Sequence, residues 1–242
     1  MNFQGKTAIV TGGTSGIGES TVRGLLEQGA YVLVLGRNEE KGKALEQLGN
    51  CTFYACQMGD PESIEQVCKQ ILKDHPKIDI LVNNAGMSVD GTVESLSLEQ
   101  WNEIFAVNVT SIFLMSKYIV PAMKQNGYGR IINVGSTAGT VGAWGLHAYS
   151  ATKGAVIQLS KSMAAEYAKD GILVNCLCPG GTRTPLMEGI GANDLDEFTK
   201  LFPIGRLAQP EEIANTIIFL ASEQSSFMTG SVVLVDGGFT CI

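Results

Sequence analysis

Apolar runs of four or five residues recur along the chain, and longer stretches with helical spacing of apolar positions lie between them. Unbroken apolar runs are typical of strands that are covered on both faces of a sheet. We therefore predict seven strands, at Thr7 to Val10, Tyr31 to Leu35, Thr52 to Ala55, Ile78 to Val82, Arg130 to Val134, Leu173 to Leu177 and Ser231 to Val235.

The stretches between these runs carry signals for helix starts and ends. The signals are an apolar face at Val22, Leu25 and Leu26 that ends at Gly29, an N-cap and proline at Asp60-Pro61, a capping box at Ser97 and Gln100, and Pro210. Strands that alternate with helices form a parallel sheet covered on both sides. The predicted class is α/β, a Rossmann-type doubly wound parallel seven-stranded sheet with helices on both faces, which binds ligands beyond the carboxyl ends of its strands.

The 242 residues are 45% apolar and 17% charged, which suits one large domain. No linker or repeat divides them, so we expect a single domain over residues 1–242. The start, Met1 to Lys6, is too short and polar for a secretory leader, and the longest apolar runs fall short of a bilayer span. These features predict a cytoplasmic protein that does not contact a membrane.

Charge and cysteine spacing exclude several other partners. The net charge of -7 argues against nucleic acid, because phosphate recognition needs a concentrated Lys/Arg surface, and also against strongly acidic protein partners. The six cysteines lack CxxC or Cys/His metal spacing, so we expect neither a disulfide nor a metal site. They are Cys51, Cys56, Cys68, Cys176, Cys178 and Cys241.

A glycine cluster, Thr11 to Gly18, directly follows the first predicted strand and opens the first predicted helix. Glycines here permit a tight turn and the close approach of a pyrophosphate, whose charge the helix N-terminus favours. The alternative is a simple turn without a ligand. The position between strand and helix favours a dinucleotide site.

Tyr149 and Lys153 lie four residues apart in a long helical pattern and therefore share one helix face. A nearby ammonium group favours the deprotonated form of a phenol, which suits a tyrosine for proton transfer. Ordinary surface pairs have the same spacing, so this pair needs support from other residues.

That support stands at the ends of other strands. Asn83-Asn84-Ala85-Gly86 follows the fourth strand, Ser136 the fifth and Pro179-Gly180 the sixth, while Asn108 lies in the helix after the fourth. With its motifs in this order and spacing, the chain resembles the short-chain dehydrogenase/reductase family over essentially its full length. The resemblance implies hydride transfer between a nicotinamide and a secondary alcohol or ketone.

The resemblance also implies a role for each residue of a catalytic set. Tyr149 would donate the proton in reduction and accept it in oxidation, and Ser136 would hydrogen-bond the reacting oxygen. Lys153 would hold the nicotinamide ribose and favour the phenolate. Asn108 would hold a water that connects Lys153 to solvent.

A cofactor site is implied as well. Its expected residues are Gly12, Thr14, Ser15, Gly16, Ile17, Gly18, Arg37, Asn38, Met58, Asn84, Ala85, Gly86, Tyr149, Lys153, Pro179, Gly180, Thr182 and Thr184. For Asn83 we favour a structural role that braces neighbouring strands. The family usually places an aspartate against the adenine after the third strand; here Gln57 occupies that position, and Asp60 is better explained as a helix cap. A contact between Gln57 and adenine stays open.

Two residues at the end of the second strand predict a preference for NADPH over NADH. An enzyme specific for NAD needs a carboxylate there for the ribose hydroxyls, and Gly36 stands in that position. Arg37 follows, and its guanidinium can pair with a 2′-phosphate. The alternative is that Arg37 starts a solvated helix and is partly neutralised by Glu39 and Glu40.

Two segments are expected to form the substrate walls, Thr137 to His147 and a lid at residues 181–203. Lys and Arg are nearly absent from both apart from Arg183 and Lys200, and a bulky apolar ketone of the steroid or bile-acid type is the leading expectation, with a hydroxysteroid dehydrogenase as the enzyme. The alternative is that many of these side chains pack a lid or a subunit contact. The apolar side chains are Val141, Ala143, Trp144, Leu146, Leu186, Met187, Ile190, Leu195, Phe198, Leu201 and Phe202.

A second reading is a 3-oxoacyl-[acyl-carrier-protein] reductase, which the chain also resembles at Gly205-Arg206 and Pro210-Glu211-Glu212. Such reductases offer two basic residues to an acidic carrier, and the corresponding positions here are Gly127 and Asp170. A reading from another class is a non-catalytic dinucleotide-sensing module.

The family commonly forms oligomers, so we expect a homo-oligomer, a tetramer. The expected contact surfaces are Ile112, Phe113, Met115 and Ile119 on a long central helix, and the segment Phe227 to Val235.

Overall fold

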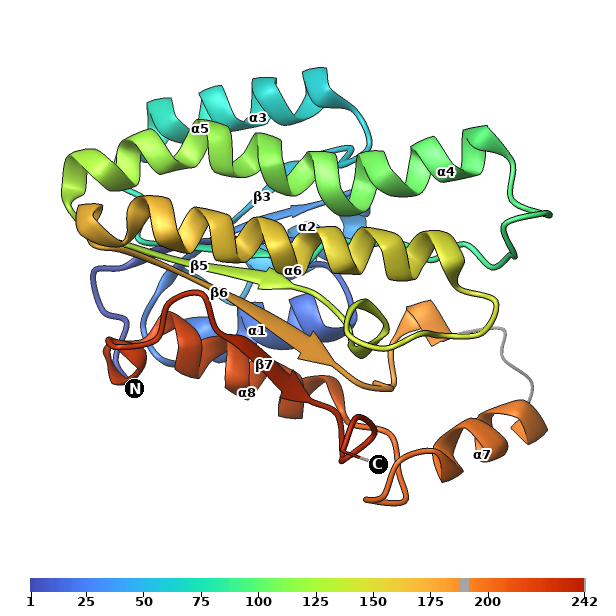
Figure 1. The fold of residues 1–242 in the computed structure, drawn as a ribbon. Coiled ribbons are helices and arrows are strands. Elements are labelled where there is room, and N and C mark those ends of the chain that lie inside the picture. The colour runs from blue at the N-terminus through green and yellow to red at the C-terminus, as the bar shows by residue number, and fades with distance from the viewer. Residues whose placement is uncertain (188–191, 242) are drawn as a thin grey trace.

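In a computed structural model that describes residues 1–187 and 192–241, seven parallel strands form one sheet in the order β3-β2-β1-β4-β5-β6-β7 (Figure 1). The sheet confirms the predicted fold class and all seven predicted strands, whose bounds differ from the expectation by at most two residues. The strands are β1 (Thr7–Thr11), β2 (Tyr31–Gly36), β3 (Cys51–Ala55), β4 (Ile80–Asn83), β5 (Gly129–Val134), β6 (Ile172–Pro179) and β7 (Val232–Val235).

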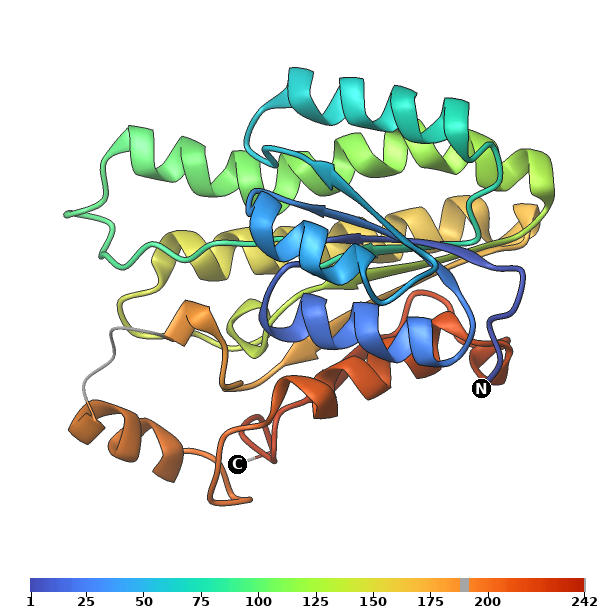
Figure 2. The same cartoon turned by 180° about the vertical axis from the view of Figure 1, so that it is seen from behind.

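Helices cover both faces of this sheet, as the two opposite views show (Figures 1 and 2). A π-helical turn, Ala106–Thr110, joins α4 directly to α5. The helices are α1 (Gly16–Glu27), α2 (Glu39–Glu46), α3 (Pro61–Asp74), α4 (Leu98–Phe105), α5 (Ser111–Asn126), α6 (His147–Tyr167), α7 (Ala192–Lys200) and α8 (Pro210–Ala221).

The core forms one layer on each side of the sheet, because successive strand residues point to opposite faces. Val10 and Val34 belong to the layer beneath α1, α2 and α8. Ile9 and Leu33 belong to the layer beneath α3, α5 and α6. Burial on both faces explains why the strands appear in the sequence as unbroken apolar runs.

The predicted helix signals act as expected. The Asp60 side chain accepts from the Glu62 N–H at 3.0 Å, which confirms it as the cap of α3. Ser97 and Gln100 form the predicted reciprocal capping box of α4. Pro210 is the first residue of α8.

Asn83 braces two strands, as predicted. Its Nδ2 donates to Asn133 Oδ1 at 2.8 Å, and Asn133 Nδ2 donates to Ser160 Oγ on α6 at 2.9 Å. All three residues are buried, so these bonds satisfy polar groups that water does not reach. They fix β4, β5 and α6 relative to one another.

In the α4–α5 region one finding concerns helix length, and another corrects the expected oligomer surface. Leu98–Asn126 is a continuous helical stretch of 29 residues that is long and apolar enough to cross a membrane by length and composition alone, although half of its most apolar window is buried within the fold. Of the four residues expected as an oligomer surface, Ile112, Met115 and Ile119 are buried. Only Phe113 is exposed, because the other three side chains point toward the protein interior.

Candidate active site

A cleft of about 1990 Å³ opens beyond the carboxyl ends of the strands. A pocket for one small ligand typically occupies roughly 300–1,000 Å³, so this cleft has room for a dinucleotide and a substrate together. Every residue predicted for catalysis or cofactor binding lines it except Gly18 and Asn108. Most of the residues predicted from the sequence therefore lie around one cleft. The positions of Gly18 and Asn108 are described separately below.

The glycine turn forms one wall of the cleft. Gly12 and Gly16 have φ of 63° and 51°, a left-handed conformation that glycine adopts without strain. Ser15 stands at the N-cap of α1 but makes no side-chain capping bond. An anion at this end of α1 would therefore not compete with a capping side chain for the first N–H groups.

Gly18 is predicted as a cofactor contact, but it does not line the cleft. It lies behind the turn, where a Cβ would collide with the Gly12 carbonyl oxygen and stand 2.6 Å from Asn84 Nδ2. Gly18 thus lets α1 pack closely against the turn that it follows.

Asn84 ties the glycine turn to the end of β4. Its Nδ2 donates to the carbonyl oxygens of Thr11 at 3.0 Å and Gly12 at 3.3 Å. In return, the backbone N–H groups of Asn84 and Ala85 donate to Thr11 Oγ1 at 3.0 Å. Asn84 lines the cleft as predicted, and it also holds together two segments that line it.

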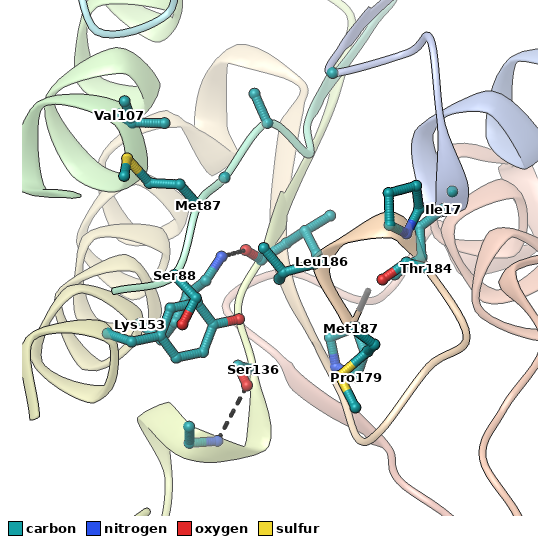
Figure 3. Close-up of a pocket in the computed structure, with 18 of the residues that line it drawn as sticks. Ile17, Met87, Ser88, Val107, Ser136, Lys153, Pro179, Thr184, Leu186 and Met187 are labelled. Atoms are coloured by element: carbon teal, nitrogen blue, oxygen red, sulfur yellow. Dashed lines mark hydrogen bonds between the residues drawn. The ribbon is translucent and has the colours of Figure 1, made fainter. Parts of the chain in front are cut away.

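Tyr149 and Lys153 line the cleft from the first turns of α6, and Lys153 is labelled in Figure 3. Lys153 is only 4% exposed, and its Nζ donates to the Val134 carbonyl oxygen at the end of β5, at 2.9 Å. This ammonium lies 5.5 Å from the centre of the Tyr149 ring. The helix thus places a fixed positive charge beside the phenol.

Ser136 follows the end of β5 and caps a short 3₁₀ turn, Thr137–Gly139. Its Oγ accepts from the Ala138 N–H at 3.1 Å (Figure 3). Gly139 then packs on α6, where a Cβ would lie 2.6 Å from the Lys153 carbonyl carbon. This close approach holds the Ser136 turn against the helix that carries Tyr149.

Asn108 does not line the cleft, because it lies fully buried in the π-helical turn behind it. Its Oδ1 accepts from the Met87 N–H at 2.8 Å, and its Nδ2 donates to the Met87 carbonyl oxygen at 2.9 Å. A Cβ at Gly86 would lie 3.4 Å from Asn108 Oδ1 and 3.6 Å from Lys153 Nζ. The glycine therefore keeps the space between these two atoms open.

Two buried thiols lie in β6 beneath the Ser136 turn, with Sγ atoms 3.8 Å apart. A hydrogen bond from Cys176 holds the pKa of Cys178 below its usual value, and the Ser136 backbone and the Lys153 charge act in the same direction. The same hydrogen bond and burial raise the pKa of Cys176. The field of Lys153 thus extends below the floor of the cleft.

The sequence matches a family model described as "Enoyl-(Acyl carrier protein) reductase" over residues 12–240. It is 40% identical to an "Uncharacterized oxidoreductase" of Thermotoga maritima, over 100% of both chains. The chain belongs to the short-chain dehydrogenase/reductase family. Other family members with high similarity are the 3-oxoacyl-[acyl-carrier-protein] reductases of Escherichia coli, 38% identical over 98% of both chains, and Vibrio cholerae, 40% identical over 100% of both.

Solved structures of family members have the same fold. A putative NAD(P) dependent gluconate 5-dehydrogenase from Beutenbergia cavernae, described with bound NADP at low occupancy, is 33% identical with a TM-score of 0.95 over 100% of this chain and 99% of that one. The family uses NAD(P)(H). This short-chain dehydrogenase/reductase is an enzyme that acts on CH–OH or C=O groups, and the reading as a non-catalytic dinucleotide-sensing module is set aside.

The end of β2 carries two cations toward the cleft. Arg37 is exposed and lines it, and Lys41, which the sequence reasoning missed, lines it one helical turn further on. Asn38 also lines the cleft, but its side chain caps α2 by accepting from the Lys41 N–H at 2.9 Å. A Cβ at Gly36 would lie 2.9 Å from Thr14 Cγ2, so close packing as well as charge favours glycine there.

The remaining predicted cofactor residues lie at the ends of β3 and β6. Met58 lines the cleft, as do Gln57 and Asp60, whose roles the sequence left open or assigned to a helix cap. Past β6, a Cβ at Gly16 would lie 3.0 Å from Thr184 Cγ2. Thr184 thus packs on the glycine turn from the opposite side of the cleft.

Both segments predicted as substrate walls contribute residues to the cleft, and so does a third segment that was not predicted. The segment after Gly86 also lines the cleft. The sequence could have indicated this, because Asn84 to Gly86 stand at a strand end and the chain must leave the sheet there. Leu195 and Leu201 do not line the cleft, and Ile190 lies outside the described residues. Outside the residues predicted for the cofactor, the cleft is lined by Met87, Ser88, Asp90, Gly91, Thr92, Ser95, Glu103, Val141, Ala143, Trp144, Leu146, Leu186, Met187, Phe198, Phe202 and Phe239, among others.

Two of these walls are joined directly. The Gly91 N–H donates to the Gly145 carbonyl oxygen at 2.7 Å, and Gly91 forms an isolated parallel bridge with Leu146. The segment after β4 is therefore attached to the segment that leads into α6.

The position of Gly18 predicts the result of adding one methyl group. Gly18→Ala should lower the free energy of unfolding by about 1–3 kcal/mol, because the turn or α1 must shift to relieve the collision. The control is Gly154→Ala in α6, where the nearest atom is 3.7 Å away and the helix interior favours alanine by roughly 0.5–1 kcal/mol. Thermal denaturation followed by circular dichroism measures both; equal melting temperatures for the two variants would contradict this account.

Proposed function

We propose that this enzyme interconverts a ketone and a secondary alcohol with NADP(H), and that 3-oxoacyl thioesters are the first substrate class to test. The observation that carries the proposal is the grouping of Tyr149, Lys153 and Ser136 at one cleft, with Asn108 directly behind it. Relatives over the whole chain that are named 3-oxoacyl-[acyl-carrier-protein] reductase support the substrate class.

The cleft residues fit a bound NADP. The glycine turn leaves no side chain at Gly12 or at Gly16, the first residue of α1, and Arg37 and Lys41 offer positive charge where β2 ends. When bound, the nicotinamide supplies the hydride. The chain supplies alignment and a proton.

Tyr149 is the proposed proton donor in reduction and base in oxidation. The Lys153 ammonium lies 5.5 Å from the centre of the Tyr149 ring, and the Val134 carbonyl oxygen holds that ammonium in place. Ser136 is proposed to donate its hydroxyl hydrogen to the reacting oxygen, which is compatible with its Oγ accepting from Ala138. These donors favour a substrate oxygen that gains negative charge during reduction.

Asn108 is proposed to hold a water that connects Lys153 to solvent. Both N–H groups of its side-chain amide donate to protein acceptors, so a water would have to donate to Asn108 Oδ1 or to the Asn108 backbone carbonyl oxygen. The space beside Gly86 lies within reach of both Asn108 Oδ1 and Lys153 Nζ, and a water there would contact both.

A bulky apolar ketone is the second candidate substrate. The apolar side chains of two walls favour it. The lack of basic residues at the two positions where carrier-dependent relatives have them, Gly127 and Asp170, also favours it. Gly127 has φ of 59° at the C-terminus of α5, a conformation that favours glycine. Asp170 carries a negative charge and is paired with Lys124 at 2.9 Å, so this position offers no basic group to an acidic carrier. The steroid class itself finds no support in the names of the relatives reported above.

The proposal includes one domain over residues 1–242 with a substrate lid at about 181–203, and a cytoplasmic location. The six cysteines lie in the described part of the chain and are free thiols, which suits a reducing compartment.

A panel of NADPH oxidation assays tests the function. Acetoacetyl-CoA, a 3-oxoacyl carrier-protein thioester and a 3-ketosteroid are compared by kcat/KM, and the thioesters are expected to be the better substrates. Tyr149→Phe should lose roughly 10³-fold in kcat while NADPH still binds, because only the proton step is affected. A higher kcat/KM for the steroid reverses the order of the candidates, and near wild-type kcat in Tyr149→Phe removes this residue from the mechanism.

The second prediction is that the enzyme prefers NADPH over NADH. One or two charge-assisted bonds from Arg37 contribute about 1.5–3 kcal/mol, which corresponds to a preference of roughly 10- to 150-fold. Arg37→Leu should remove most of it. Arg23→Leu serves as control, since Arg23 is exposed on α1 and pairs with Glu19. Equal use of both cofactors by the unmodified enzyme would show that Arg37 is only a surface charge.

The third prediction is a homotetramer. Phe113 is 51% exposed, and the end of the chain adds Phe227 at 103% and Leu234 at 43%, so both elements expected at subunit contacts present apolar side chains. Light scattering after size exclusion should give four times the chain mass of 25.7 kDa. A monomeric mass at micromolar concentration would refute this.

A further inference from the structure

Thr152 joins Asn108 to Tyr149. It stands in α6 immediately before Lys153, is fully buried and does not line the cleft. Its Oγ1 is 3.1 Å from Asn108 Nδ2 and 2.7 Å from the Tyr149 carbonyl oxygen. A residue that cannot contact a ligand in the cleft is therefore bonded to two proposed members of the catalytic set.

The direction of each hydrogen bond is fixed by the chemistry of the partners. An amide nitrogen can only donate, so Thr152 Oγ1 accepts from Asn108 Nδ2. A carbonyl oxygen can only accept, so the same hydroxyl donates to Tyr149. The orientation of the Asn108 amide is in turn fixed by Met87, which donates to its oxygen and accepts from its nitrogen.

The contact ties the first turn of α6 to the π-helical turn of Asn108. Leu146 stands at the N-cap and cannot provide a capping side chain, and no side-chain cap bond is present there. The Thr152 hydroxyl does not replace a cap, because a cap accepts from backbone N–H groups and this hydroxyl donates to a carbonyl oxygen. It instead links the Tyr149 carbonyl oxygen to the Asn108 amide, and so adds a tertiary contact to a helix start that no side chain caps.

We infer that Thr152 is a positioning residue, which keeps the Tyr149 backbone in a fixed relation to Asn108 and to Met87 on the cleft wall (Figure 3). The inference rests on the proposed roles of Tyr149 and Asn108. Three sets of hydrogen bonds act in series. Met87 fixes the orientation of the Asn108 amide, and that amide fixes the orientation of the Thr152 hydroxyl. The hydroxyl in turn fixes the position of the helical turn that carries the Tyr149 phenol.

The same helix offers a matched control. Ser160 Oγ accepts from Asn133 Nδ2 at 2.9 Å and donates to the Val156 carbonyl oxygen at 2.7 Å, and it is buried to a similar degree. Its partners lie outside the cleft. Removing this hydroxyl takes the acceptor at Ser160 from the buried Asn133 amide, as removal of the Thr152 hydroxyl takes one of two acceptors from the buried Asn108 amide. The loss at Ser160 does not involve a bond to Tyr149.

The test compares Thr152→Val, Thr152→Ser and Ser160→Ala by steady-state kinetics with acetoacetyl-CoA and NADPH, and by thermal denaturation. Thr152→Val keeps the side-chain shape and removes the hydroxyl; its kcat should fall roughly 10- to 100-fold, as expected for a displaced reacting group, with KM for NADPH within about threefold of wild type. Thr152→Ser keeps the hydroxyl and should restore kcat to within about threefold. Ser160→Ala should lose thermal stability without loss of kcat.

Wild-type kcat in Thr152→Val, an equal loss of kcat in Ser160→Ala, or a failure of Thr152→Ser to restore kcat would each overturn the inference. Tyr149→Phe, measured alongside, separates it from the proposed function. Full activity in Tyr149→Phe would remove both, whereas an inactive Tyr149→Phe beside a fully active Thr152→Val removes the positioning role alone.

Discussion

Parallel pairing of the strands is the constraint on which this structure depends. It brings the carboxyl ends of all seven strands to one edge, so segments far apart in the sequence must leave the sheet at the same place. The Asn83–Asn133 hydrogen bond between β4 and β5 fixes these two strands relative to each other at that edge. The glycine turn after β1, Asn84 after β4 and Ser136 after β5 therefore meet around one cleft.

Much of this arrangement could be predicted from the sequence, because the signals are local. Buried parallel strands show unbroken apolar runs, and the caps at Asp60 and Ser97 need only a few neighbouring residues. Most predicted cofactor residues line the cleft for the same reason, since strand ends carry them there. Lys41 is also local in this sense, one turn after Arg37.

What the sequence did not reveal depends on three-dimensional packing. Ile112, Met115 and Ile119 are apolar whether they face a core or a partner subunit. The rotation of α5 about its axis decides which of the two they face. Gly18 belongs to the glycine cluster, but it lies behind the turn that lines the cleft. The hydrogen bonds of Asn108 to Met87 and Thr152 join residues 21 and 44 positions away, which no local pattern specifies.

The bridge between Gly91 and Leu146 has a consequence for how such an enzyme acquires new specificity. The side of the cleft with the glycine turn is shaped largely by strand ends, whereas the side proposed to hold the substrate consists of connecting segments, which vary more readily. Two of those segments share a backbone hydrogen bond, from Gly91 to Gly145. The two segments should therefore be exchanged together. If residues 87–96 were replaced by the segment of a relative, residues 137–147 would have to be replaced as well for the new segment to find its matching partner.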